Sequence, residues 1–197
     1  AGADPAMADQ ITPEAIAGRV AGCRNNIERL AETIAEARLD ALIIVGDDQH
    51  EQYHDENQPA MLVYWGDSIR NEMVQLPDDA PDHWRRARAQ FHEQAGPRDY
   101  PVESGLALHL AEHLIENQFD ISHGRFLQHD RGEGHAFGFV HRRLMSDAIV
   151  PVVPVILNTY FPPNQPRPGR CLALGRAIRA AVEDWEPGRR IGILASG

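Results

Sequence analysis

The most informative stretch of the sequence reads Ala41-Leu42-Ile43-Ile44-Val45-Gly46, followed at once by Asp47-Asp48-Gln49-His50. A continuous apolar run that ends at a glycine is typical of a strand buried on both faces, as in a parallel or mixed sheet. Apolar residues recur at helical spacing from Ile16 to Ala37 before it, and a second amphipathic pattern runs from Val102 to Asn117 after it. Helix and strand patterns therefore alternate, which predicts an α/β protein.

The remaining elements follow from the same periodicities and from their start and stop signals. Thr12 as cap and Pro13 in the first turn predict where the first helix begins, and it is expected to end near Arg38. Further patterns predict, in chain order, strand Met61–Trp65, a short strand from Phe119, strand Val150–Leu157, helix Cys171–Trp185 and strand Ile191–Ala195. We expect a mixed β-sheet flanked by helices, with residues 1–197 forming a single domain.

Three segments depart from regular patterns. Pro151 and Pro154 interrupt the β-branched run at 150–157, and proline favours an edge or an irregular strand. The stretch Leu76–Pro101 is rich in Pro, Asp and Arg, and we expect a surface excursion with a short helix near Trp84. The final apolar run reads as a buried strand. Because a domain seldom ends on such a strand, we expect these residues to be part of a longer protein.

Composition excludes several functional classes. The chain has 197 residues, of which 43% are hydrophobic and 24% charged, as in an ordinary globular domain. The formal net charge is −10 and no basic run offsets it, which argues against a nucleic-acid partner. All 19 basic residues are arginine, so a lysine Schiff base and a P-loop lysine are both excluded.

Cysteine usage and hydropathy indicate the compartment. Cys23 and Cys171 are far apart and cannot form a disulfide scaffold, while free thiols suit a reducing cytoplasm. No stretch reaches the ~20 apolar residues of a membrane span. The first residues also lack the pattern of a signal peptide. We therefore expect a cytoplasmic protein that does not associate with a membrane.

The acidic segment at 47–57 begins where the first strand ends. In open α/β sheets, ligands bind beyond the carboxyl ends of the strands, so His50 is well placed to bind a metal ion. His50 and His54 also have the i, i+4 spacing of a zinc site on a helix, with Glu51 or Asp55 as the added carboxylate. This spacing offers a metal hydrolase as an alternative. A solvated acidic loop fits the same composition.

Two later segments carry further candidate residues. His135 lies among three glycines that permit close backbone approach to a ligand, and it could donate a hydrogen bond or relay a proton. A flexible turn with an exposed histidine fits the same pattern. A proline-stiffened loop that includes Tyr160 can form the wall of a pocket. Arg170, near a helix start, could bind a carboxylate or be an ordinary surface arginine.

Taken together, these segments resemble the class III extradiol ring-cleavage dioxygenases, the family of the protocatechuate 4,5-dioxygenase catalytic subunit. Asp40–His50 resembles the family's second metal-ligand segment, in which a strand ends in an acidic turn and an iron-binding histidine. Ser104–Ile115 resembles the family's central helix, and His135 lies where the family has an active-site histidine. The most specific match comprises Pro151–Tyr160, Pro162-Pro163 and Arg170–Gly175.

The resemblance covers about Ile27–Gly197, without the loop Leu76–Arg98. It implies a non-haem Fe(II) ion held by two histidines and one glutamate, with open positions for substrate and oxygen. His50 would be a metal ligand, His135 a catalytic residue, and Tyr160 and Arg170 substrate contacts. A catechol would chelate the iron, and O2 would open the ring next to the two hydroxyls. The family often works as homo-oligomers or with a small partner subunit.

The sequence also departs from the family pattern. Gly134 stands where aspartate is usual, and Ala136 where glycine is usual. The family's other iron ligands and its base histidine have no counterpart here, so we expect this 197-residue chain to bind Fe(II) weakly and not to cleave catechols. The unmatched loop indicates a substrate that differs from the typical one. Two other functions stay open: a zinc-type hydrolase using His50 and His54, and a non-catalytic scaffold member.

Overall fold

The apolar run after residue 40 lies within a five-stranded sheet, in a computed structural model that describes residues 4–128, 131–146 and 148–197. The strand order is β5-β2-β6-β1-β7. Strand β1 pairs in parallel with β6 and β7, whereas β2 pairs antiparallel to β6 and in parallel with β5. The strands are β1 (Ala41–Asp47), β2 (Met61–Tyr64), β5 (Ser122–Gly124), β6 (Val152–Leu157) and β7 (Ile191–Ser196). The sheet is therefore mixed, as predicted.

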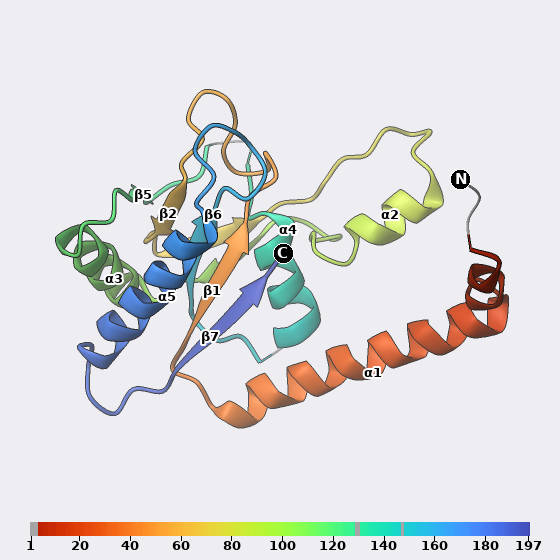
Figure 1. The fold of residues 1–197 in the computed structure, drawn as a ribbon, viewed down its shortest axis with the longest axis horizontal. Coiled ribbons are helices and arrows are strands. Elements are labelled where there is room, and N and C mark those ends of the chain that lie inside the picture. The colour runs from red at the N-terminus through yellow and green to blue at the C-terminus, as the bar shows by residue number, and fades with distance from the viewer. Residues whose placement is uncertain (1–3, 129–130, 147) are drawn as a thin grey trace.

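Helices cover both faces of this sheet (Figure 1). On one face, α3 (Ser104–Glu116) and α5 (Pro168–Glu183) pack against each other. The other face carries α4 (His135–Phe139) and its continuation η2 (Val140–Met145), with part of α1 (Pro13–Ala37) packed on η2. This arrangement confirms the predicted α/β fold class, a mixed β-sheet flanked by helices.

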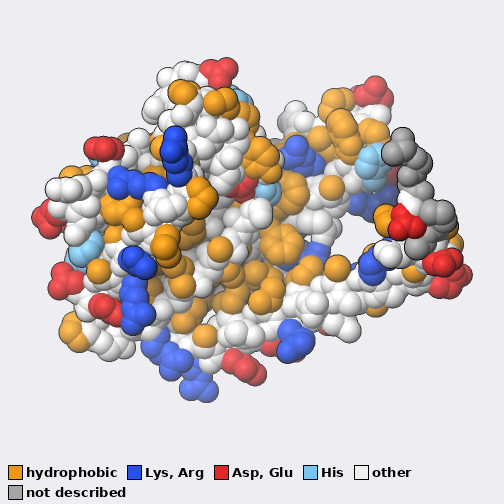
Figure 2. Space-filling view, viewed as in Figure 1, with side chains coloured by type: hydrophobic (Ala, Val, Ile, Leu, Met, Phe, Trp, Pro, Cys, Tyr) orange, Lys and Arg blue, Asp and Glu red, His pale blue; other side chains and the backbone are white. Residues whose placement is uncertain are grey.

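Helix α1 begins and ends as its sequence predicts. The Thr12 hydroxyl oxygen accepts a hydrogen bond from the backbone N–H of Ala15, and Arg38 ends the helix in the left-handed conformation. After a short 3-10 helix η1 (Pro5–Gln10), α1 runs past the body of the molecule, and only Ile34 on it is buried. The space-filling view is hollowed between α1 and the α2 region (Figure 2). In the described part of the chain, no helix is both long and apolar enough to cross a membrane.

Two expectations about strand position were wrong. Strand β6 is central, not at an edge, despite Pro154. Its antiparallel pairing with β2 ends at Val63–Val155, so no β2 residue needs the backbone N–H that Pro154 lacks. Strand β7, expected to be buried, lies at the edge of the sheet, and the side chain of Ile193 is exposed. Strand β7 pairs with β1, and its other edge has no neighbouring strand among the described residues.

The segment expected as a surface excursion is one, and it contains the predicted short helix, α2 (Asp82–Arg88). Its base is a two-stranded antiparallel ladder that the sequence reading missed, formed by β3 (Ser68–Asn71) and β4 (Arg98–Pro101). Four-residue strands with charged side chains carry little hydrophobic alternation, which explains why periodicity did not reveal them. The excursion therefore leaves and rejoins the body at one place.

A buried polar network ties this hairpin to the helical layer. The carboxylate of Glu133 lies 2.8 Å from Nδ1 of His141 and accepts a hydrogen bond from the side-chain amide of Asn71 at 2.7 Å. All three side chains are buried. The ring of Tyr100 on β4 stacks on His141, with 4.0 Å between ring centroids. Because an unpaired polar group would be costly at this depth, the network holds β3, β4 and η2 in one arrangement.

We expect the variants Glu133→Leu and His141→Phe each to lower the free energy of unfolding by ~3–5 kcal/mol, because each leaves a buried group without its partner. The double variant should lose less than the sum of the two single losses, since both polar groups are then absent. Urea denaturation of the wild type and the three variants measures this. Strictly additive losses would show that the two side chains do not interact.

Candidate active site

The loop after β1 is organised by one buried carboxylate, that of Asp48. Asp48 is completely buried, and its two oxygens accept hydrogen bonds from the backbone N–H groups of Glu51, Gln52 and Tyr53 at 2.9–3.0 Å. Hydrogen bonds to an ionised acceptor are about twice as strong as neutral ones. Asp48 therefore pins the turn, and the side chains of residues 50 and 51 leave it in fixed directions.

His50 lies in this turn, beyond the carboxyl end of β1. Its backbone is in the left-handed region, with φ of 59°, a conformation that is uncommon for residues other than glycine and clusters at functional sites. Its ring stacks on Phe161, with 3.5 Å between centroids and 7° between planes. The backbone N–H of Phe161 donates to Oδ1 of the buried Asn158, just after β6. The loops after two neighbouring strands thus hold the imidazole together.

His135, the first residue of α4, lies between two acids. Its Nδ1 is 2.6 Å from Oε2 of Glu51, and its backbone N–H donates to both oxygens of the same carboxylate at 3.1 and 3.2 Å. On the other side of the ring, Nε2 is 3.6 Å from Oδ1 of Asp47. Asp47 is buried, and this oxygen accepts no hydrogen bond within the described residues. The loop after β1 and the start of α4 therefore meet at His135.

The contacts in this cluster shift the pKa values of both His135 and Glu51. The hydrogen bond to Glu51 raises the pKa of His135 against the opposing effect of burial, and the charges of Glu51 and Asp47 raise it further. Burial by itself would raise the pKa of Glu51, but the hydrogen bonds and charge of His135 outweigh it and hold that pKa below its ordinary value. Glu51 is thus a carboxylate that holds a proton on Nδ1 of His135, and Nε2 is left for exchange with a ligand.

The absence of a side chain at residue 134 gives Glu51 its place. A Cβ on Gly134 would lie 2.8 Å from Oε2 of Glu51, closer than such atoms approach one another. The carboxylate beside His135 therefore comes from the loop after β1 and not from the neighbouring chain position. Glycine at this position, where the family that the sequence resembles usually has aspartate, thus leaves room for the Glu51 carboxylate.

A cavity of about 440 Å³ opens beside the Glu51–His135 pair. The side chains that matter on its wall are Leu76, Trp84, Arg88 and Phe91, from α2 and its flanks, facing Glu51 and His135. The ring of Phe91 meets that of His135 edge-on, with 5.9 Å between centroids. Aromatic walls with a few converging polar groups are the usual form of a small-molecule site.

The other predicted site residues lie at different distances from this centre. Tyr160 is exposed and lines a neighbouring hollow together with Asp47 and Thr159. Arg170 lies elsewhere: its guanidinium donates to the carbonyl oxygen of Gln118 and stacks 4.0 Å above the ring of Phe119. Among the described residues, no hydrogen bond, ion pair or ring contact joins Arg170 to His135. The substrate roles of Tyr160 and Arg170 stay predictions.

The helical arrangement imagined for His50 and His54 is wrong. The segment at 48–57 contains no helix, because the left-handed His50 and the Asp48 turn interrupt the helical path. The two rings are tilted, with 5.7 Å between centroids. The i, i+4 spacing of a helical zinc site is therefore not realised.

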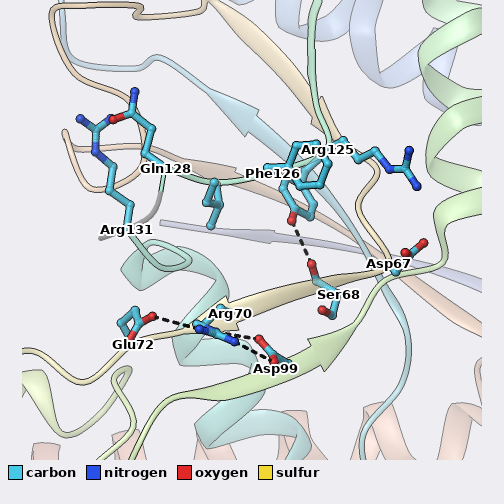
Figure 3. A pocket seen from close by; sticks show the side chains of 11 residues that line it. Asp67, Ser68, Arg70, Glu72, Asp99, Arg125, Phe126, Gln128 and Arg131 are labelled. Atoms are coloured by element: carbon cyan, nitrogen blue, oxygen red, sulfur yellow. Dashed lines mark hydrogen bonds and ion pairs between the residues drawn. The ribbon is translucent and has the colours of Figure 1, made fainter.

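A second polar pocket lies beside β3 and β4 (Figure 3), and His135 is not among the residues that line it. Three of its charged side chains pair with one another: Arg70 is 2.9 Å from Asp99 and 3.9 Å from Glu72. Exposed ion pairs of this kind contribute little to stability. Because Arg70 already pairs with Asp99 and Glu72, this pocket offers weaker chemistry than the cavity beside His135.

The structure allows a test of whether a metal ion fits. Nε2 of His50 and Oδ1 of Asp47 are buried atoms of the kinds that bind metal ions. Neither has a hydrogen-bond partner among the described residues. However, no three His, Cys, Asp or Glu side chains in the described ranges come together in a way that could hold a metal. The described residues thus supply part of a ligand set and not a complete one.

Comparison with known proteins now adds to this geometry. Residues 3–197 match the family described as the catalytic LigB subunit of aromatic ring-opening dioxygenase, which is almost the entire chain. The chain belongs to the LigB family. The resemblance inferred from the sequence segments is therefore confirmed at the level of the family.

Two characterised relatives share part of this sequence. The chain is 32% identical over 97 residues to a 2,3-dihydroxyphenylpropionate/2,3-dihydroxicinnamic acid 1,2-dioxygenase of Comamonas testosteroni, which covers 49% of this chain and 29% of that protein. It is 32% identical over 110 residues to a gallate dioxygenase of Pseudomonas putida KT2440. That match covers 53% of this chain and 31% of that protein. The matched region spans less than a third of the length of each relative.

The sequence singled out His50 and His135 as candidates but not the groups that position them. Asp48 was seen only as part of an acidic loop, although it directly follows a buried strand, and Glu51 was considered only as the carboxylate of the alternative zinc site. Trp84, Arg88 and Phe91 also carry a signal, since their i, i+4, i+7 spacing predicts one helical face. The contact between Glu51 and His135 spans 84 positions, so no local spacing rule reveals it.

We expect Asp48→Ala to lower the free energy of unfolding by roughly 3 kcal/mol or more, because three N–H groups, one buried and two partly buried, lose their shared acceptor. Asp48→Asn should cost less, since its remaining oxygen still accepts part of this set. Urea denaturation measures the loss, and hydrogen exchange should be fastest at Glu51, Gln52 and Tyr53. Unchanged exchange at these amides in Asp48→Ala would contradict the proposed anchor.

A second prediction concerns pH and the metal-free protein. The depressed pKa of Glu51 adds stability above its unfolded value of about 4.3, and the raised pKa of His135 adds stability that is complete below about 6.5 and lost at higher pH. Glu51→Gln should therefore destabilise most between about pH 4.5 and 6.5, and NMR titration should show a lower His135 pKa. An unchanged His135 pKa in this variant would show that Glu51 does not hold the ring.

Proposed function

We propose that the complete protein is an Fe(II)-dependent extradiol dioxygenase that opens a catechol-type aromatic ring with O2. The observation that carries this proposal is the Glu51–His135 pair, set between the buried Asp47 and an aromatic-walled cavity at the carboxyl end of β1. Membership of the LigB family and the dioxygenase names of the two relatives support the same reaction class. Because the match covers less than a third of each relative, the activity of the whole protein is a proposal.

His50 is proposed as one iron ligand. Its ring is fixed by stacking on Phe161, and its Nε2 is buried without a hydrogen-bond partner in the described residues, as expected for a nitrogen kept for a metal. When bound, Fe(II) supplies open coordination positions for a catechol and O2. The described residues do not supply a complete set of iron ligands. The proton transfers proposed for this chain therefore involve only its own side chains.

His135 is proposed to handle protons beside the ring. Glu51 keeps a proton on Nδ1 and fixes the orientation of the imidazole, so Nε2 can accept a proton from a substrate hydroxyl or return one to the product. Asp47, 3.6 Å from Nε2, favours the protonated form of the imidazole after that transfer. Phe91 packs edge-on against the His135 ring and adds an apolar surface to the cavity beside it.

We expect His50→Ala in the complete protein to abolish bound iron and ring-opening activity while leaving the fold intact, because a ligand at a strand end is not part of the core. Metal analysis, circular dichroism and oxygen uptake with a catechol measure these three properties. His135→Ala should lower the rate with iron retained. Full activity in His50→Ala would show that His50 is not a ligand.

The same measurements separate this proposal from the alternatives. Zinc in place of iron, together with hydrolysis without oxygen uptake, would favour the metal hydrolase. If the complete protein contains neither metal nor activity, the non-catalytic scaffold is the better reading.

A further inference from the structure

We infer that the excursion around α2 forms a binding wall for an aromatic substrate with an anionic substituent, and that Arg88 is the partner of that anion. This inference rests on the proposed function, since it names the substrate class of the same site. It assigns a role to the loop Leu76–Arg98, which the resemblance seen in the sequence does not cover. Its residues line the cavity that His135 faces.

One helical face of the excursion points into the cavity. Trp84 and Arg88 lie on α2, and the backbone keeps turning beyond it, because the N–H groups of Gln90 and Phe91 donate to the carbonyl oxygens of Ala87 and Arg88. Trp84, Ala87, Arg88 and Phe91 therefore follow the i, i+3, i+4, i+7 spacing of a single face, and all four line the cavity. The face alternates aromatic surface with one positive charge.

The charge of Arg88 is available to a ligand. Its Nη1 lies 3.9 Å from Oε1 of Glu51, beyond hydrogen-bond distance, and its guanidinium stands 5.6 Å from the centre of the Phe91 ring. Its side chain is 45% exposed, at the margin of the cavity. Within the described residues, none of its five N–H donors makes a hydrogen bond. A guanidinium with unused donors next to aromatic walls suits a planar carboxylate, which it can bind with two parallel hydrogen bonds.

Glu51 does not neutralise Arg88 completely, because it is already engaged by His135. Its carboxylate accepts hydrogen bonds from Nδ1 of the His135 ring, at 2.6 Å, and from the backbone N–H of His135. In contrast, Arg70 is paired with Asp99 on the hairpin, and Arg142 is paired with Glu93. Among these arginines, Arg88 alone lines the cavity that His135 shares. A ligand carboxylate would balance the positive charge that Arg88 brings to this wall.

The wall is held firmly against α4. The buried side chain of Asn71 donates to the carbonyl oxygen of Phe91 at 2.8 Å, and its oxygen accepts the backbone N–H of Glu93 at 2.8 Å. A Cβ on Gly138 in α4 would overlap that same carbonyl oxygen, so the two backbones approach as closely as glycine permits. Because Asn71 also bonds Glu133, the buried network fixes the distance between the wall and His135.

The cavity also has a suitable size. At about 440 Å³ it lies at the lower end of the range for small-molecule sites, which suits one substituted ring and not a polymer. A ring that lies between Trp84 and Phe91, with its reacting edge toward His135, would bring a substituent on the opposite edge toward Arg88. The class predicted is therefore a single-ring aromatic acid.

The test compares an acid with its neutral isostere in the complete metal-free protein. We expect benzoate to bind more tightly than benzamide, and Arg88→Gln to reduce this preference about tenfold, which corresponds to loss of one charge-assisted contact. Arg86→Gln is the matched control, because Arg86 lies on the same helix and does not line the cavity. Trp84→Ala should weaken both ligands alike. NMR titration gives the dissociation constants.

Each outcome decides the matter. Equal weakening of benzoate and benzamide in Arg88→Gln, or an unchanged preference, overturns the role of Arg88. If Arg88→Gln does not fold, Arg88→Lys replaces it: a preference reduced less than tenfold supports the inference, and an unchanged one overturns it.

Turnover separates this inference from the proposed function. Ring opening of a carboxylated catechol and of its amide with equal efficiency overturns the substrate class while the dioxygenase function stands. An Arg88-dependent preference for benzoate without any oxygen uptake has the opposite meaning, since the anion site stands and the dioxygenase function fails.

Discussion

The site depends on the buried carboxylate of Asp48 and its three backbone hydrogen bonds. A chain that leaves a buried strand must satisfy its N–H groups quickly, and Asp48 does this within one turn. The same turn forces His50 into the left-handed region against Phe161 and directs Glu51 toward the start of α4. One acid that never meets a ligand thereby places the imidazole proposed to bind iron and the carboxylate that orients His135.

A second buried acid, Glu133, plays the corresponding part on the opposite wall. It holds Asn71 and His141, and Asn71 in turn holds the backbone at Phe91 and Glu93. The α2 excursion looks like a surface loop from the sequence, yet its base is fixed by this network. The cavity is thus bounded by two segments, each tied down by a carboxylate whose removal would leave several polar groups unsatisfied. Such pre-organisation favours a site that binds without large rearrangement.

The sequence predicted what local patterns determine. The continuous apolar run of β1, the capped helix α1 and the position of His50 after a strand all follow from short-range rules, and each element is found. The predicted edge position of β6 was wrong because a proline is costly in a sheet only where a neighbouring strand needs the N–H that it lacks. Whether that is so depends on where β2 ends. The pairing of Glu51 with His135 and of Glu133 with Asn71 joins residues 84 and 62 positions apart, beyond any spacing rule.

The most direct test of this account is a crystal structure of the complete protein soaked without oxygen in benzoate. The account predicts the ring between Trp84 and Phe91, its carboxylate on the guanidinium of Arg88, and the Glu51–His135 contact unchanged. Benzoate bound in the hairpin pocket around Arg70, with the cavity beside His135 closed by side chains, would contradict it.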